Sequence, residues 1–191
     1  MSYSFLKESK LYLVYGGNKY RIHTTSSITF SQTFAEDSYP VKTLHDQSKM
    51  FEGSTITKAN PANFSFEVPL TAEKDESIVI TLLSDLTDAQ LKSFDIYVQT
   101  GSSTFKIESA IITNADFAFA TRNQFLVAIS GQGTKLTRAG NESYTIPGTA
   151  QSESATRTPQ TIYPVVTIDS LDMSSILSAN VSIATEISWT K

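Results

Sequence analysis

Cysteine is absent from the 191-residue sequence, and only two histidines are present. The lack of cysteine excludes disulfides, thiolate metal sites and cysteine nucleophiles. Two histidines without cysteine do not make a zinc motif. No stretch approaches the roughly 18 consecutive apolar residues that a membrane span needs, and the start of the chain lacks the pattern of a secretory signal. We therefore expect no cofactor, no metal and no membrane partner.

Charge is also sparse, with 18% charged residues and a formal net charge of −4. The sequence has no basic cluster and no alternation of arginine with aromatic residues, which argues against specific binding to nucleic acid. Hydrophobic residues make up 40% of the chain, a proportion typical of a globular protein. The length fits one large domain, or one domain with an appendage.

A recognisable catalytic constellation is missing as well. His45 and Asp46 are the one candidate acid–base pair in the sequence. A general base needs a positioned partner and a nucleophile, and neighbouring residues on a strand point apart. The Gly131–Gly133 segment lacks the helix and the Lys-Ser/Thr pair of a phosphate loop. The sequence therefore predicts a protein that is not an enzyme.

What the sequence does contain is alternation of apolar and polar residues with a period of two. It is clearest between Phe105 and Leu136, and again in Asn63–Val68. Such alternation is typical of antiparallel strands that bury one face. The side chains that we expect on the buried face include Phe30, Phe34, Phe64, Phe66, Phe105, Ile107, Ile111, Phe117, Phe119 and Phe125.

Turn-forming residues divide these strands. A hairpin is predicted over Leu11–His23, because Gly16-Gly17-Asn18 supplies the positive φ that tight hairpins require. Asn114–Asp116 and Thr121–Asn123 are predicted to be turns or bulges. We expect Gly131–Gly133 to break or kink the last strand of this region.

One helix is predicted between Asp75 and Phe94. Ser84 or Asp85 is a candidate cap for a helical segment ending at Lys92. The preceding run Ile78–Leu83 fits either a strand or the first turns of the same helix.

A long segment without clear periodicity, Glu36–Gly53, is predicted to be a loop. Loops longer than about 12–15 residues are uncommon in compact domains unless they are functional. We interpret it as a contact loop between subunits, and the alternative is a surface excursion that packs on its own domain. The contact residues that we expect in it are Tyr39, Pro40, His45, Met50 and Phe51.

The predicted fold is mainly β, with two packed antiparallel sheets of the kind that form a sandwich or a barrel, one short helix and a C-terminal extension. Residues 1–138 form the β domain, 139–161 a polar linker or arm, and 162–191 a strand-forming extension. The extension contains Ser178–Trp189, a Ser/Thr-rich strand that weakly echoes Ser26–Phe34. Because the strands have few features that protect sheet edges, either another subunit or a loop is expected to cover those edges. A closed ring of subunits would cover all of them at once.

The order of these parts resembles that of bacteriophage tail tube proteins and of the inner-tube proteins of contractile machines. The resemblance covers about residues 10–138. It consists of an opening strand pair, the strand Ser27–Phe34, the long loop, a strand ending Phe66–Pro69, a helix and a closing strand pair ending Ile129–Gly131.

The resemblance implies a structural virion protein of the tail, assembled in the host cytoplasm, or a baseplate-end variant of it. It also implies hexameric rings, joined into a continuous barrel and stacked into a tube through which DNA passes without being bound specifically. The partners would be further copies of the chain and other tail or baseplate proteins. The polar residues expected to face the lumen are Thr29, Ser31, Thr33, Ser65, Glu67, Lys106 and Glu108. The alternative function is a β-sandwich binding module, either carbohydrate-binding or a virion fibre or adhesin domain.

Overall fold

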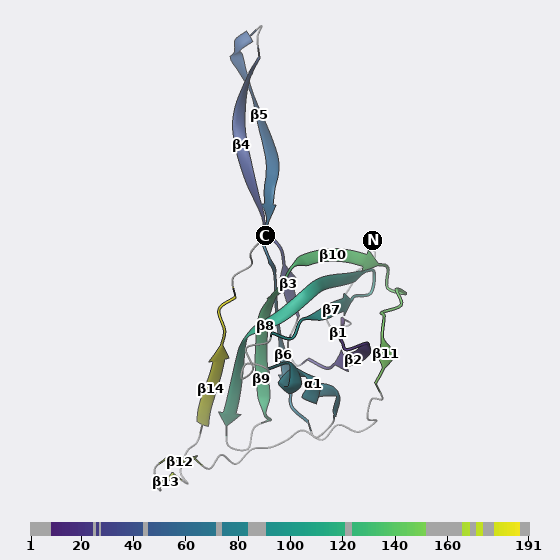
Figure 1. The fold of residues 1–191 in the computed structure, drawn as a ribbon, viewed down its shortest axis with the longest axis vertical. Helices are drawn as coiled ribbons and strands as arrows, with labels where there is room; N and C mark the ends of the chain where they lie inside the picture. The colour runs from purple at the N-terminus through teal and green to yellow at the C-terminus, as the bar shows by residue number, and fades with distance from the viewer. Residues whose placement is uncertain are drawn as a thin grey trace.

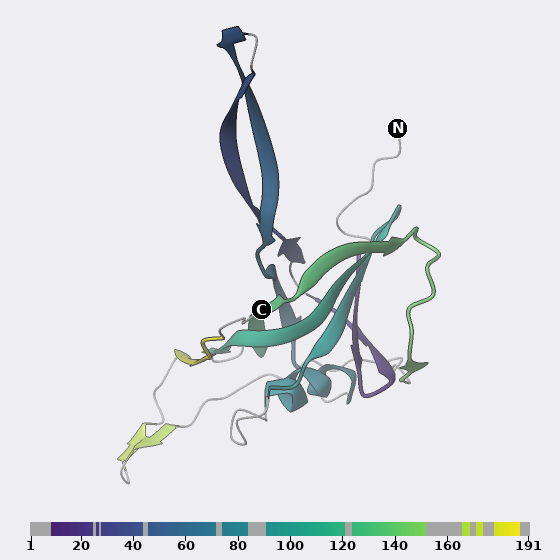
Figure 2. The same cartoon turned by 45° about the horizontal axis from the view of Figure 1, so that its top comes forward.

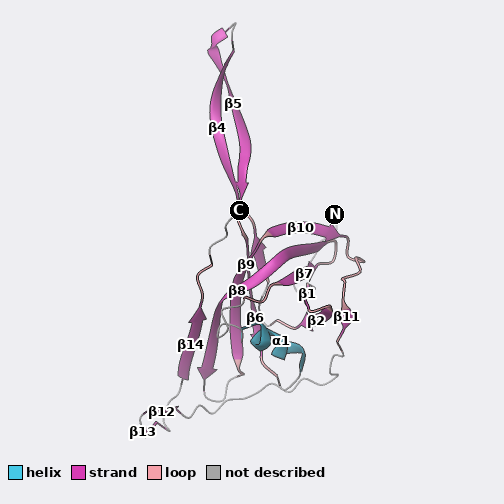
Figure 3. Ribbon diagram, in the orientation of Figure 1, coloured by secondary structure: helices cyan, strands magenta, loops and turns pink. Residues whose placement is uncertain are grey.

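The computed structural model describes residues 9–24, 26, 28–43, 46–71, 74–83, 91–120, 124–151, 166–168, 171–173 and 178–187. Strands dominate, and a single helix, α1 (Lys74–Leu83), appears in the described part of the chain (Figure 3). The predicted mainly β fold is confirmed. The strands are β1 (Lys10–Tyr15), β2 (Asn18–Ile22), β3 (Thr29–Ser31), β4 (Phe34–Thr43), β5 (Asp46–Ala59), β6 (Ala62–Pro69), β7 (Phe94–Gln99), β8 (Thr104–Ala120), β9 (Leu126–Gly133), β10 (Lys135–Gly140), β11 (Thr149–Ala150), β12 (Val166–Ile168), β13 (Leu171–Met173) and β14 (Ser178–Ala184).

Ten strands form one sheet, and the 17-residue strand β8 joins its two halves (Figure 1). β9 and β10 follow one another along β8, while β7 pairs with the first part of β8 and β14 with the second. We call β1, β2, β7, β10, β11 and the first part of β8 the β1 half. The β3 half consists of β3, β6, β9, β14 and the second part of β8. Figure 2 shows the sheet bending along β8, so that the predicted two layers are halves of a single sheet.

The hairpin at the start of the chain forms as predicted, because Gly16 and Gly17 adopt φ values of 57° and 77°. β1 then pairs with β7, which places Leu11 and Leu13 in the core with Ile96. The β1 half is antiparallel except at β11, which runs parallel to β2.

A bulge in β8 changes which side chains are buried. Ser109 has a φ of 48°, and the register with β7 shifts between Phe94 and Ile96. As a result Ile107 and Ala110 are both buried, whereas Ile111 is only half-buried, so the prediction that Ile111 lies on the core face with Ile107 was wrong. An irregularity of this kind inserts one extra residue and reverses the alternation beyond it.

Two predicted interruptions lie inside continuous strands. Asn114–Asp116 is part of β8, with a register shift between Ile112 and Asn114, so this segment contains a bulge and not a turn. Gly131–Gly133 does not break its strand, because β9 pairs with β6 through to Gly133. The segment Thr121–Asn123 lies outside the described residues.

A single hydrophobic core lies between the two halves of the sheet and α1. Phe64 and Phe66 are buried in it, and Phe30 packs against Phe105 with a centroid separation of 5.3 Å. Phe117 and Phe125 are partly buried against the same core. One predicted core residue lies elsewhere, because the side chain of Phe34 is 52% exposed at the base of β4. Phe119 is half-buried near the end of β8, and its ring stacks on that of Phe125 with a centroid separation of 4.8 Å.

The helix occupies the earlier part of the predicted helical region. Ile78, Val79, Leu82 and Leu83 of α1 are buried, while Ile80 is exposed. This spacing is that of an amphipathic helix with one face on the core. The ambiguous run Ile78–Leu83 is therefore helical, and the candidate caps at Ser84 and Asp85 lie outside the described residues.

The segment predicted as a long loop is a β-hairpin instead. β4 and β5 pair antiparallel from Phe34–Ala59 to Thr43–Asp46, with two irregularities. The hairpin stands away from the sheet in both views (Figures 1 and 2). A ribbon that buries neither face on a core gains nothing from alternating residues, which explains why the sequence shows no period. Pro40 is compatible with it, since a two-stranded ribbon consists entirely of edges.

Gly131 of β9 lies opposite Phe64 of β6, where only glycine fits. We predict that Gly131→Ala destabilises the fold. A Cβ at this position would lie 2.2 Å from the carbonyl oxygen of Ile111 and 2.4 Å from Cζ of Phe64. Overpacking of this kind costs about 1–3 kcal/mol. Urea unfolding would measure the loss, and Ser130→Ala is the matched control, because Ser130 is only half-buried. An unchanged midpoint for Gly131→Ala would contradict this packing.

Candidate assembly surfaces

The outward face of the β3 half carries polar side chains on each of its strands. The register aligns Thr29 with Ser65, Ser65 with Ser130, and Ser130 with Asn114. A second row places Glu67 beside Ala128, Ala128 beside Asp116, and Asp116 beside Ser182. We call this surface the polar face. It consists of Thr29, Ser31, Asn63, Ser65, Glu67, Ile111, Asn114, Asp116, Ala118, Leu126, Ala128, Ser130, Gln132, Asn180, Ser182 and Ala184.

The opposite face of the same strands is apolar and covers the core. Phe66, Ile129 and Ala115 form one buried row, and Val68 and Val127 belong to the next. The alternation predicted for Asn63–Val68 is therefore confirmed, with Phe64, Phe66 and Val68 buried. This strict division fixes which side of the sheet meets solvent.

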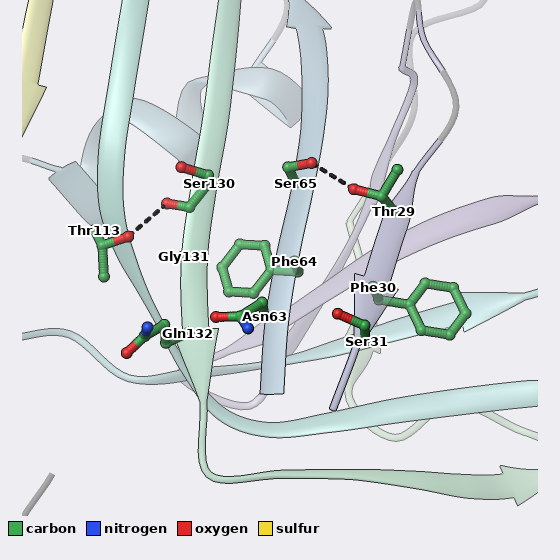
Figure 4. Close-up of a pocket in the computed structure, with 10 residues that line it drawn as sticks. All are labelled: Thr29, Phe30, Ser31, Asn63, Phe64, Ser65, Thr113, Ser130, Gly131 and Gln132. Carbon is green, nitrogen blue, oxygen red and sulfur yellow. Dashed lines mark hydrogen bonds between the residues drawn. The ribbon is translucent and has the colours of Figure 1, made fainter. Parts of the chain in front are cut away.

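Hydrogen bonds connect the hydroxyl and amide groups of the polar face. The hydroxyls of Thr29 and Ser65 lie 2.5 Å apart, and the Thr113 hydroxyl donates to the carbonyl of Ser130 at 3.3 Å (Figure 4). Between these strands lies a shallow hollow of about 360 Å³, lined by residues of β3, β6, β8 and β9. The ring of Phe30 points away from it, so small polar groups form most of its wall (Figure 4).

The formal charges of the polar face are negative only. Glu67 and Asp116 are its ionisable residues, and none of its described residues is a lysine or an arginine. The Asn114 side-chain amide donates to the Asp116 carboxylate at 2.8 Å and thereby holds it in place. A surface of this composition repels the phosphates of a nucleic acid weakly and offers them no cation.

Two residues predicted to face the lumen, Lys106 and Glu108, lie on the β1 half. Lys106 Nζ is 3.1 Å from Asp95 and 3.4 Å from Glu108, and 5.8 Å from the centre of the Tyr97 ring. Burial raises the pKa of Tyr97. Burial acts to lower the pKa of Lys106, but the hydrogen bond and charge of Asp95 outweigh it and raise that pKa. This cluster is therefore an ion-pair network away from the polar face.

Asp95 supports both this cluster and the bulge of β8, and we predict a modest loss of stability for Asp95→Ala. Its carboxylate accepts the Ser109 backbone N–H at 3.0 Å in addition to pairing with Lys106. These contacts are partly exposed, so we expect a loss of about 1 kcal/mol in chemical unfolding. Glu108→Ala, which removes only the 3.4 Å ion pair, should cost less. Equal losses for both variants would contradict the role of Asp95 at the bulge.

The remaining predicted residues that the structure describes fall in three places. Thr29, Ser31, Ser65 and Glu67 lie together on the polar face. Thr33 is exposed after β3, where its backbone carbonyl accepts the Asn60 N–H at 3.0 Å. The contact residues Tyr39 and Pro40 lie in β4 and Met50 and Phe51 in β5, whereas His45 lies outside the described residues.

Several members of the polar face were not predicted from the sequence. Asn63 alternates with Phe64 and Phe66, and Ser130 follows Ile129, so the period of two was a usable signal for both. Asn114 and Asp116 were missed because the segment was interpreted as a turn or a bulge between strands. The bulge that places them on the polar face depends on pairing with β9, which lies more than ten residues away.

The edges of the β3 half are β3 and β14. β3 pairs with β6 on one side, and no described strand lies on its other side. β14 covers the second part of β8, and its outer edge is likewise without a partner among the described strands. Unpaired edges of this kind are templates for strands of another chain.

Within the described residues, no group of three or more His, Asp and Glu side chains is placed to hold a metal ion. No helix in that part of the chain is long and apolar enough to cross a membrane.

Comparison with one solved structure supports the fold. One chain of a cryo-EM structure titled as an extracellular contractile injection system, PVC sheath-tube complex in extended state, is 13% identical, with 69% of this chain and 88% of that chain covered and a TM-score of 0.50. Chains of the anti-feeding prophage cap (the AFP tube terminating cap; 13% identity, 68% and 87% covered) and of a PVC sheath/tube terminator in extended state (11%, 68% and 92%) each give a TM-score of 0.48.

Comparison with curated proteins finds no match. A family model does match: the Bacteriophage Baseplate Tube Protein Family covers residues 1–191, and the chain belongs to that family.

Proposed function

We propose that this member of the bacteriophage baseplate tube protein family is a structural subunit of a phage tail tube at or near the baseplate. Six copies form a ring, the β3 halves line its hole with the polar face, and rings stack into a conduit through which DNA passes. The chain has no catalytic role in this assembly. It forms in the host cytoplasm and becomes part of the virion tail.

The observation that carries this proposal is the polar face. It contains hydroxyl, amide and carboxylate groups, while its described residues include no cation that would hold a phosphate backbone. A conduit should let its cargo slide, and an uncharged to acidic lining meets that need. Glu67 and Asp116 repel the cargo, and the surrounding serines and asparagines keep water at the wall.

The projecting hairpin supports the stacking part of the proposal. An isolated two-stranded hairpin is marginally stable in water, and a third strand or a packing surface is needed to stabilise it. β4 and β5 extend away from the described body of their own subunit (Figure 1). A neighbouring ring would provide the missing surface, so we assign the ring-to-ring contact to residues 36–56, including Tyr39, Pro40, His45, Met50 and Phe51. Other tail or baseplate proteins would meet the outer surface of the tube.

The alternative, a carbohydrate-binding or adhesin module, has less support. A candidate site for it among the described residues would be the 360 Å³ hollow. Sugar rings pack well on exposed aromatic faces, but the Phe30 ring points away from this hollow and Phe64 is buried (Figure 4).

Size-exclusion chromatography with light scattering, followed by negative-stain microscopy, tests the proposal on the full-length protein. We expect annular particles, and tubes at higher concentration. A compact monomer throughout the concentration range would contradict the proposal and would favour the binding module.

A further inference from the structure

We propose that β14 is a temporary cover for β8, and that strand β3 of a neighbouring copy replaces it when the ring closes. This inference rests on the proposed function, since it concerns how the ring is joined. The surface is the edge of β8 at residues 113–119, and its partner is a second copy of this chain. β14 would thus keep the free subunit from pairing with the wrong strand.

The first argument concerns strand direction. Every neighbouring pair in the β3 half is antiparallel, in the order β14-β8-β9-β6-β3. With five strands, the two edge strands β14 and β3 run in the same direction. Rotation about a ring axis preserves strand direction, so a ring that kept β14 would join β3 to β14 of the next copy in parallel.

Removal of β14 changes this geometry. β3 of one copy would then meet β8 of the next, and these strands run in opposite directions. The sheet around the ring would be antiparallel at every joint. Antiparallel pairs are slightly more stable per residue, and sheets of one kind are over-represented.

The second argument is that β14 presents the same chemistry as β3. Asn180 and Ser182 of β14 lie on the polar face, as do Thr29 and Ser31 of β3. Between them Val181 faces the core side, as Phe30 does in β3. A β3 strand seated on β8 would therefore keep polar side chains on one face and an apolar side chain on the other.

The third argument is that β14 is held mainly by its backbone. None of its residues is buried, and the Val181 side chain is 49% exposed. The Ser182 hydroxyl donates to the Asn114 amide oxygen of β8 at a long distance of 3.4 Å. A strand held in this way is easily exchanged for another of the same pattern.

A disulfide that locks β14 onto β8 tests the inference, and the cysteine-free chain gives a clean background. The Thr185 N–H donates to the Thr113 carbonyl at 2.7 Å, so these two opposite residues form a hydrogen-bonded pair. The pair types alternate along an antiparallel ladder, so Asn180 and Ala118, five positions away, form a non-hydrogen-bonded pair. Cα atoms in such pairs are about 4.5 Å apart, within the range of disulfides. The test variant is Asn180→Cys with Ala118→Cys.

The matched control is Ser65→Cys with Ser130→Cys. The Leu70 N–H donates to the Phe125 carbonyl, and Ser65 and Ser130 lie five positions from this pair, so they also form a non-hydrogen-bonded pair. This pair joins β6 to β9 inside the sheet. We expect the oxidised Asn180/Ala118 variant to lose rings, reduction to restore them, and the oxidised control to form rings normally.

Rings from the oxidised Asn180/Ala118 variant at the wild-type yield would overturn the inference and leave the proposed function standing. Absence of rings from the wild type would overturn both. A second variant, Val181→Pro, serves if the disulfide does not form, since it removes a backbone donor that faces β8. It should form rings at a lower concentration than the wild type. A folded Val181→Pro monomer that never forms rings would show that β14 belongs in the ring.

Discussion

Shortening the β4–β5 hairpin will leave rings intact and abolish their stacking into tubes. The cut that preserves register joins Asp37 to Thr55 through Asn-Gly, because these two residues are paired in the ribbon and Asn-Gly favours a tight hairpin turn. The hairpin stands away from the sheet in both views, so the body should fold as before (Figures 1 and 2). Negative-stain counts of rings and tubes measure the effect directly.

The control for the shortened hairpin is thermal unfolding of the isolated subunit, which should be unchanged. A second control keeps the hairpin length and replaces only Tyr39 and Phe51 with serine, which separates the shape of the ribbon from its apolar contacts. Tubes of normal length from the shortened chain would contradict the assignment of ring stacking to the hairpin.

Reversing one charge on the polar face will make the ring bind DNA. Glu67→Lys places a cation in the middle of that face in every copy of the ring, so a passing duplex would meet a full circle of lysines. Each phosphate neutralised adds about 0.9 to the slope of log affinity against log salt. Six such contacts would give affinity that falls about a thousandfold between 50 and 200 mM salt. Fluorescence anisotropy with a labelled duplex measures this slope.

Glu142→Lys is the matched control for Glu67→Lys. It makes the same charge change on an exposed residue after β10, in the β1 half. It should leave DNA binding near the undetectable level that we expect for the wild type. Equal, salt-sensitive binding by both variants would mean that Glu67 does not line the path of the DNA.

The sequence was sufficient for several structural choices that depend on residues close in the chain. The β1–β2 hairpin follows from Gly16-Gly17, and the alternation of Asn63–Val68 identifies both faces of β6. The same alternation predicted from the sequence alone that Thr29, Ser31, Ser65 and Glu67 lie on a solvent-facing side of their strands.

The sequence was not sufficient for features that depend on pairing between distant strands or on the core beneath a strand. The bulge at Ser109 reverses the alternation in β8, and its carboxylate partner Asp95 belongs to another strand. That Lys106 and Glu108 face the lumen stays a prediction, and the structure places them on the β1 half, apart from the polar residues of β3 and β6. Alternation does not tell which part of a sheet a strand joins. The β4–β5 ribbon was interpreted as a loop because it has no core beneath it to impose a period.

The most direct test of the central claim is a cryo-EM reconstruction of rings assembled from the full-length protein. We predict a closed annulus in which Ser65, Ser130 and Glu67 face the hole and sheet hydrogen bonds continue from one subunit to the next. An annulus with these residues on its outer surface, or subunits that touch only through side chains with their sheet edges left free, would contradict the account.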